Sequence, residues 1–150
     1  MNLEDIAEEM RDQARRERPR SARTNWCQRL SFVVSRPVAY RGISMRSQLE
    51  ADFAHFLDGK QVRWDYEPEY FGGPGEGYLP DFRIVRDTGA TYVEVKPTIA
   101  EVPRAQKRLE LVWERHPDAT LLVVCGEGNN FYAALNGQPW ESWTERWKHR

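Results

Sequence analysis

Two carboxylates and a lysine in the middle of the chain have the types and spacing that suit metal-assisted chemistry. Glu94 and Lys96 stand two residues apart in a run of strand-forming residues, so their side chains emerge on one face while Val95 points to the other. A hairpin that pairs this strand with the preceding one brings Asp81 beside Glu94. Two carboxylates and an ammonium group then share one face of a sheet.

Paired carboxylates of this kind indicate a site for a hard divalent cation. Magnesium in phosphoryl-transfer sites is commonly held by one or two carboxylates, with water and phosphate completing its shell, and Asp81 and Glu94 supply such a pair. The cation makes a bound water easier to deprotonate and neutralises charge on a phosphate, while Lys96 orients or deprotonates that water. Glu50, beside the apolar stripe of an earlier helix, is expected to hold either a second metal or a metal-bound water.

Apolar periodicity predicts the helix that carries Glu50. Either Ser44 or Ser47 can cap this helix, and Gly59 ends it. Its apolar face is formed by residues at i, i+4, i+7 and i+8, namely Leu49, Phe53, Phe56 and Leu57. The glutamate lies at the margin of this face, so we expect it to face inward.

Three successive strands are predicted after this helix. Alternation over residues 62–66, followed by extended patterns over 78–85 and 91–96, indicates an antiparallel meander with a flexible glycine-rich connection over 72–77. A second helix from about Val102 to His116 precedes an apolar strand over 120–125. A strand that follows a crossover helix usually lies parallel to an earlier one, so the sheet should be mixed. The predicted class is α/β, with a central mixed sheet flanked by helices.

The predicted organisation is one core with an extension at each end. Residues 40–136 form the core, 1–39 a charged arm, and 137–150 a tryptophan-rich helix, preceded by a short strand over 131–135. The helix is indicated by the i, i+3, i+7 spacing of Trp140, Trp143 and Trp147. These rings either stack on nucleic-acid bases or, more often at this spacing, pack on a core or a partner.

Charge is balanced overall and uneven along the chain. A formal charge of -1 does not by itself indicate a nucleic-acid-binding protein, but residues 11–36 contain eight arginines against two acidic residues. This basic arm either contacts phosphates or forms a solvated charged helix. The candidate DNA-contacting residues are Arg15, Arg16, Arg18, Arg20, Arg23, Arg46 and Lys107.

Other site classes find little support in the sequence. Cys27 and Cys125 are far apart, and no histidine spacing completes a zinc site. No apolar window is long enough to span a membrane, and the acidic start of the chain is unlike a signal peptide. We therefore expect a soluble, cytoplasmic protein without a membrane partner.

The ordered motifs resemble those of the PD-(D/E)XK nuclease superfamily. These are the helix Glu50, the segment Pro80-Asp81-Phe82 and the strand Glu94-Val95-Lys96. Within that superfamily, the runs 46–50, 66–67, 78–82 and 92–96 are similar to the phage junction-resolving endonuclease I family. They are also similar to phage head-completion nucleases and to the DNA-cleaving subunit of Tn7-type transposases. The resemblance covers roughly residues 40–125.

This resemblance implies a restriction-endonuclease-like core and a Mg²⁺- or Mn²⁺-dependent endodeoxyribonuclease. It adds the Val95 carbonyl as a metal ligand beside Asp81 and Glu94. It also implies a phage- or mobile-element-related protein that cleaves branched DNA, DNA ends or transposon ends. Cutting both strands usually needs two sites, so a homodimer or a larger phage or transposon assembly is expected, in the host cytoplasm or in the virion.

Two alternatives remain open at the level of sequence. One is a non-catalytic or partner-dependent DNA-binding component of a virion or transposition assembly. The other is a protein-interaction module whose tryptophan-rich tail carries the function. A lone Glu-x-Lys on a strand is usually a solvated sheet face, but its company of Asp81 and Glu50 favours the catalytic interpretation.

Overall fold

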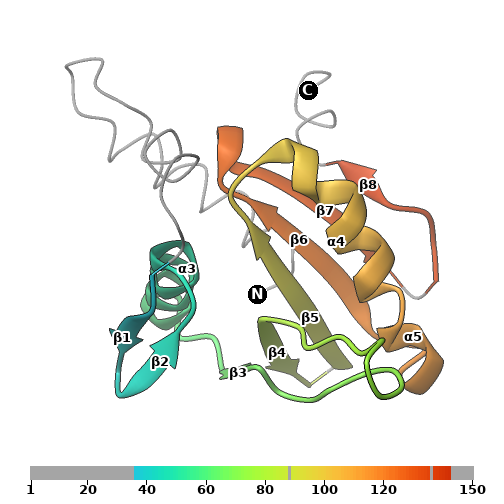
Figure 1. Cartoon of the computed structure of the whole chain (residues 1–150), viewed down its shortest axis with the longest axis horizontal. Coiled ribbons are helices and arrows are strands. Elements are labelled where there is room, and N and C mark those ends of the chain that lie inside the picture. The colour runs from blue at the N-terminus through green and yellow to red at the C-terminus, as the bar shows by residue number, and fades with distance from the viewer. Residues whose placement is uncertain (1–35, 88, 136, 143–150) are drawn as a thin grey trace.

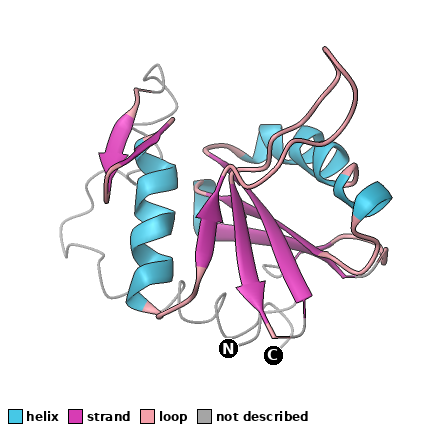
Figure 2. Ribbon diagram, turned by 90° about the horizontal axis from the view of Figure 1, so that it is seen from below, coloured by secondary structure: helices cyan, strands magenta, loops and turns pink. Residues whose placement is uncertain are grey.

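The computed structural model describes residues 36–87, 89–135 and 137–142 of the chain. Within them, a six-stranded sheet has helix α3 (Gln48–Gly59) on one face and helices α4 (Val102–Leu109) and α5 (Val112–Arg115) on the other (Figures 1 and 2). The predicted α/β class is confirmed. In sheet order the strands are β3 (Trp64–Tyr66), β4 (Phe82–Arg86), β5 (Gly89–Lys96), β6 (Thr120–Cys125), β7 (Asn130–Leu135) and β8 (Glu141–Ser142).

The predicted mixed sheet is also confirmed. Strands β3, β4 and β5 pair antiparallel in sequence order, and β6 then pairs parallel to β5 after the crossover through α4 and α5. Strands β7 and β8 extend the sheet antiparallel. Because β5 and β6 are central and covered on both faces, they are almost continuously apolar, apart from the charged residues at the end of β5.

Helix α3 begins and ends where its sequence signals predict. Ser47 is the N-cap, and its Oγ accepts a hydrogen bond from the Glu50 amide at 3.2 Å. Ser44, the other candidate cap, lies in strand β2 (Ile43–Met45). The apolar face of α3 packs on the side of the sheet formed by Val93 and Val95 of β5.

A hairpin that sequence patterns did not predict precedes α3. Strand β1 (Val38–Tyr40) pairs antiparallel with β2 through a tight turn at Arg41 and Gly42, which have φ of 48° and 78°. Positive φ at both central residues is typical of the two-residue turns that suit a β-hairpin. The hairpin begins before the expected core boundary at residue 40, so the described strands include residues of the predicted arm.

The expected helix over 102–116 is divided into shorter pieces. A 3₁₀ turn, η1 (Ile99–Glu101), leads into α4, and a break at Glu110 and Leu111 separates α4 from α5. At the break, the Leu111 amide bonds to the Arg108 carbonyl and the Trp113 amide to the Glu110 carbonyl, which is the tighter i to i+3 pattern. The apolar stripe nevertheless continues, because Leu109 and Val112 are both fully buried.

Two further elements differ from their predictions. The strand expected over 78–85 begins only at Phe82, since Pro80 has no amide to donate to a ladder. The helix expected over 137–150 is wrong for its described part, because Glu141 and Ser142 pair with the edge of β7. Residues 143–150, with Trp143 and Trp147, lie outside the described residues.

The sheet separates two apolar clusters. In the first cluster, α3 packs against one face of β4, β5, β6 and β7. In the second cluster, α4 and α5 pack against the opposite face of the sheet. A short 3₁₀ turn, η2 (Glu127–Asn129), connects β6 with β7. No helix within residues 36–142 is long and apolar enough to cross a membrane.

Candidate active site

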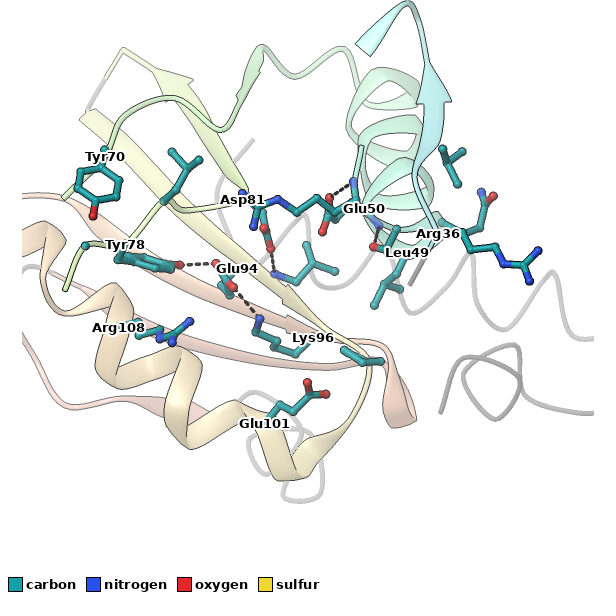
Figure 3. Close-up of a pocket in the computed structure, with 18 residues that line it drawn as sticks. Arg36, Leu49, Glu50, Tyr70, Tyr78, Asp81, Glu94, Lys96, Glu101 and Arg108 are labelled. Atoms are coloured by element: carbon teal, nitrogen blue, oxygen red, sulfur yellow. Dashed lines mark hydrogen bonds and ion pairs between the residues drawn. The ribbon is translucent and has the colours of Figure 1, made fainter. Parts of the chain in front are cut away.

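A cleft of about 780 Å³ opens where β5 ends, between the start of α3 and helix α4 (Figure 3). Its lining comes from β1, the start of α3, the loop before β4, the end of β5, η1 and α4. The structure brings together all of the residues predicted to be catalytic or metal-binding. These are Glu50, Asp81, Glu94, Val95 and Lys96.

Asp81 lies one position beyond the Phe82–Val93 pair of β4 and β5, and so falls beside Glu94 as the hairpin prediction requires. It is 5% exposed, and its Oδ2 accepts a hydrogen bond from the Val95 amide at 2.8 Å. Burial and then the charges of Glu94 and Glu50 raise the pKa of Asp81 well above its usual range. The folded site therefore disfavours the ionised form of the Asp81 carboxyl.

Glu94 is held at both of its oxygens. Lys96 Nζ lies 2.8 Å from Oε1, and the Tyr78 hydroxyl donates to Oε2. Tyr78 is buried, and this burial together with the charge of Glu94 raises the pKa of its hydroxyl. The tyrosine therefore stays protonated and acts as a fixed donor that orients the carboxylate.

Lys96 retains its positive charge. Burial alone would lower the pKa of its ammonium group, but the adjacent carboxylate of Glu94 and, further away, that of Asp81 raise it. Its backbone is fixed as well, because the Lys96 carbonyl accepts a hydrogen bond from the Gly126 amide at 2.8 Å. This charge state suits Lys96 to orient a water molecule or stabilise an anion, and it does not suit the alternative role of a base.

Glu50 reaches the cleft from the first turn of α3, although α3 packs on the opposite face of the sheet from Glu94. It is 7% exposed, and its Oε2 accepts hydrogen bonds from the Tyr66 hydroxyl at 2.6 Å and the Arg46 amide at 3.1 Å. A carboxylate in the first helical turn also interacts favourably with the helix dipole. Both the cap and the tyrosine therefore fix its position.

The donor set fits a magnesium ion that takes few acidic ligands. In the described part of the chain, no group of three or more His, Cys, Asp and Glu side chains is arranged to hold a metal ion. Two carboxylates with backbone and water oxygens are a set that magnesium accepts, and a cation there would favour the ionised form of Asp81.

Of the predicted DNA-contacting residues, one lines the cleft, one does not, and five lie outside the described residues. Arg46 lines the cleft and forms an ion pair with Glu67 at 2.5 Å. Lys107 is exposed and does not line the cleft, as its place on α4 directs it elsewhere, and Arg108 lines it instead. Arg15, Arg16, Arg18, Arg20 and Arg23 lie outside the described residues.

Sequence reasoning assigned no role to four other residues of the site. Tyr66 and Tyr78 each donate to one of the carboxylates, while Tyr70 and Arg108 line the cleft. Tyr66 and Tyr78 both fall in the motif runs, but only the fold shows which way their hydroxyl groups point. The alternation of β3 places Tyr66 on the same face as Trp64, so the sequence alone could have indicated the direction of the Tyr66 side chain.

No family model matches the chain, and no similar sequence was found among curated proteins. The resemblance drawn from short motifs thus stays a prediction.

Proposed function

We propose that this protein is a Mg²⁺- or Mn²⁺-dependent endodeoxyribonuclease that hydrolyses DNA phosphodiester bonds. The observation that carries the proposal is the convergence of Asp81, Glu94 and Lys96 from adjacent strands, with Glu50 from α3, in one cleft. Each of these acidic groups is buried and held by a hydrogen bond or ion pair. Buried carboxylates that lie together in a cleft, among them one with a perturbed pKa, are typical of functional sites.

Each side chain then has a task in hydrolysis. Asp81 and Glu94, with the Val95 carbonyl, are the groups that would hold the cation, which when bound lowers the pKa of water and neutralises charge on the phosphate. Lys96 keeps its ammonium group beside Glu94 and orients the attacking water or stabilises the phosphoryl oxygens. Glu50 would hold either a second cation or a water bound to the first.

The fold supports this proposal at a coarser level. The order of helix, strand with Pro80-Asp81, strand with Glu94-Val95-Lys96, crossover helix and parallel strand agrees with a restriction-endonuclease-like core. Fold alone does not specify an activity, so the proposal rests on the site. A phage or mobile-element origin, action as a homodimer or within a larger assembly, and a cytoplasmic or virion location belong to the same proposal.

DNA binding is assigned to the cations around the cleft. Arg36, Arg46 and Arg108 all line it, and they surround the carboxylates with groups that attract phosphate. The arginines of the N-terminal arm add to this attraction. Together they would compensate for the slightly negative charge of the whole chain.

Nicking of supercoiled plasmid tests the proposal. We expect the full chain to nick with Mg²⁺ or Mn²⁺ and to be inactive with a chelator. Asp81→Ala and Lys96→Ala should each lose about 100-fold or more in rate. Asp118→Ala, at an exposed position outside the cleft, should cut like the wild type. A wild-type protein that binds DNA but cuts nothing in either metal would instead favour a non-catalytic DNA-binding component.

A further inference from the structure

Tyr70 presents an aromatic ring within the cleft, on the side away from Glu50 (Figure 3). The residue is 49% exposed, which is unusual for a large aromatic side chain that the fold holds in place. The phenol end of the ring lies against the backbone of Gly77, where an added Cβ would fall 1.6 Å from Tyr70 Cζ. Only glycine therefore allows the ring to occupy this position.

The segment that carries Tyr70 is anchored on both sides. The Tyr70 carbonyl accepts a hydrogen bond from Arg115 at 3.2 Å, and Arg115 also forms an ion pair with Glu69 at 3.0 Å. Phe71 and Tyr78 exchange two backbone hydrogen bonds at 2.8 and 2.6 Å, which close the glycine-rich loop between them. A ring held in this way loses little conformational freedom when a ligand stacks on it.

Arg108 supplies a cation on the same side of the cleft. Its side chain projects from α4, and its charge acts on the Tyr78 hydroxyl that contacts Glu94. Among the described residues no carboxylate forms an ion pair with Arg108, in contrast to the neighbouring Arg115. A guanidinium without a carboxylate partner is suited to a phosphate group.

We infer that Tyr70 and Arg108 form a nucleotide subsite, in which Tyr70 stacks on an unpaired DNA base and Arg108 binds an adjacent phosphate. The inference rests on the proposed nuclease function and adds the class of substrate. A base inside a duplex is paired and stacked on both faces, so it cannot offer a face to Tyr70. DNA with unpaired nucleotides, such as a single strand or a flap, is therefore the preferred substrate over intact duplex.

Binding without cleavage tests the subsite directly. The full chain, in chelator, is titrated into a short fluorescein-labelled single strand and into a blunt hairpin duplex. Tyr70→Ala should weaken binding of the single strand by about 5- to 100-fold, the range expected for one stacked base, and leave duplex binding within about 2-fold. Tyr70→Phe should retain the wild-type affinity, because the ring is kept. Gly77→Ala should behave as Tyr70→Ala does, because it displaces the ring.

Two arginines of α4 serve as test and control for the phosphate contact. Arg108→Gln should weaken single-strand binding and reduce its salt dependence, while Arg104→Gln, exposed on α4 outside the cleft, should change neither. Thermal unfolding of each variant verifies that it is folded.

Cleavage separates this inference from the nuclease proposal. In Mg²⁺, Tyr70→Ala should raise KM for a flap substrate and leave kcat nearly unchanged. Equal loss of single-strand and duplex binding in Tyr70→Ala, or no loss in either, would overturn the subsite even if the wild type cuts DNA. If the wild type cuts nothing, selective loss of single-strand binding in Tyr70→Ala would still support the subsite, and only the nuclease proposal would fail.

Discussion

At the scale of single residues, the site depends on tyrosine hydroxyl groups as much as on its acids. Tyr78 donates to Glu94 and Tyr66 donates to Glu50, so each carboxylate is oriented by a neutral donor that leaves its negative charge available. Lys96 approaches Glu94 from the other side. The orientation of Glu50 and Glu94 is thus set in part by residues that do not themselves carry charge at neutral pH.

Removing one of these hydroxyl groups should damage catalysis more than folding. We expect Tyr78→Phe to lower kcat by about 10-fold, since a hydrogen bond to a charged group contributes roughly 1.5 to 3 kcal/mol and part of it is replaced by water. The buried ring is kept, so the melting temperature should fall only slightly. Single-turnover cleavage and thermal unfolding measure the two effects. Unchanged cleavage by Tyr78→Phe would mean that the hydroxyl does not position Glu94.

At the scale of elements, the first turn of α3 links helix capping to the site. Ser47→Ala removes the cap that binds the Glu50 amide, and we expect it to cost about 1 kcal/mol in the free energy of unfolding. Ser44→Ala is the matched control, because Ser44 is exposed in β2 and should have almost no effect. Urea denaturation of both variants gives the comparison, and equal stabilities would contradict the assignment of the cap.

The loop before β4 is held to α5 by a cluster around Glu69. Its carboxylate contacts Tyr92 at 2.7 Å, His116 at 2.7 Å and Arg115 at 3.0 Å. Burial raises the pKa of Glu69, but the hydrogen bonds from these partners outweigh it and lower the pKa overall. A lowered pKa in the folded state means that the stabilisation is present above the unfolded pKa and is lost as the pH falls through the folded value.

Glu69→Gln should therefore destabilise the protein only at higher pH. At pH 7 we expect a loss of about 1 kcal/mol, a modest value because the Glu69 side chain is partly exposed. The difference should shrink as the pH falls below the usual range of a glutamate and vanish in stronger acid. Urea denaturation across this pH range is the measurement, and a difference that stays constant into strong acid would contradict the charged role of Glu69.

Elements defined by local signals could be predicted, and those defined by distant contacts could not. The apolar face and cap of α3 are local, and so are the alternation of β5 and the apolar run of β6. Strand β8 forms only because the edge of β7 offers its backbone groups, which no pattern in residues 137–142 reveals. In the same way Glu94 and Lys96 could be paired from their spacing, whereas Tyr70 and Arg108 line one cleft only because of the fold.

At the scale of the whole molecule, the cleft is lined by the end of β5 together with α3 from one face of the sheet and α4 from the other. Asp81 precedes the first residue of β4, so the β4 side of the sheet is open beside the end of β5, and the first turn of α3 reaches the cleft that α4 also lines. The site is thus assembled from segments far apart in the sequence. The charge of Asp81, buried beside Glu94 and Glu50, makes the metal-free fold less stable at neutral pH than it would otherwise be.

This charge leads to a prediction for the metal-free protein. Because the folded state raises the pKa of Asp81, its ionised form is disfavoured on folding at neutral pH. We therefore expect Asp81→Asn to raise the melting temperature in chelator while it abolishes cleavage, as stability and activity often oppose one another in active sites. Asp118→Asn, at an exposed position, should leave the melting temperature unchanged. A lower melting temperature for Asp81→Asn would indicate that Asp81 stabilises the fold.

Cation binding by the free protein tests the central claim most directly, because it does not depend on choosing the right DNA substrate. Thermal unfolding of the full chain is followed as Mg²⁺ or Mn²⁺ is added, alongside Asp81→Asn and Asp118→Asn. At ten times the Kd, wild type should gain about 1.4 kcal/mol, or about 3 to 5 °C, as should Asp118→Asn, while Asp81→Asn gains nothing. No shift in the wild type with either metal, or an equal shift in Asp81→Asn, would contradict a metal site at Asp81 and Glu94.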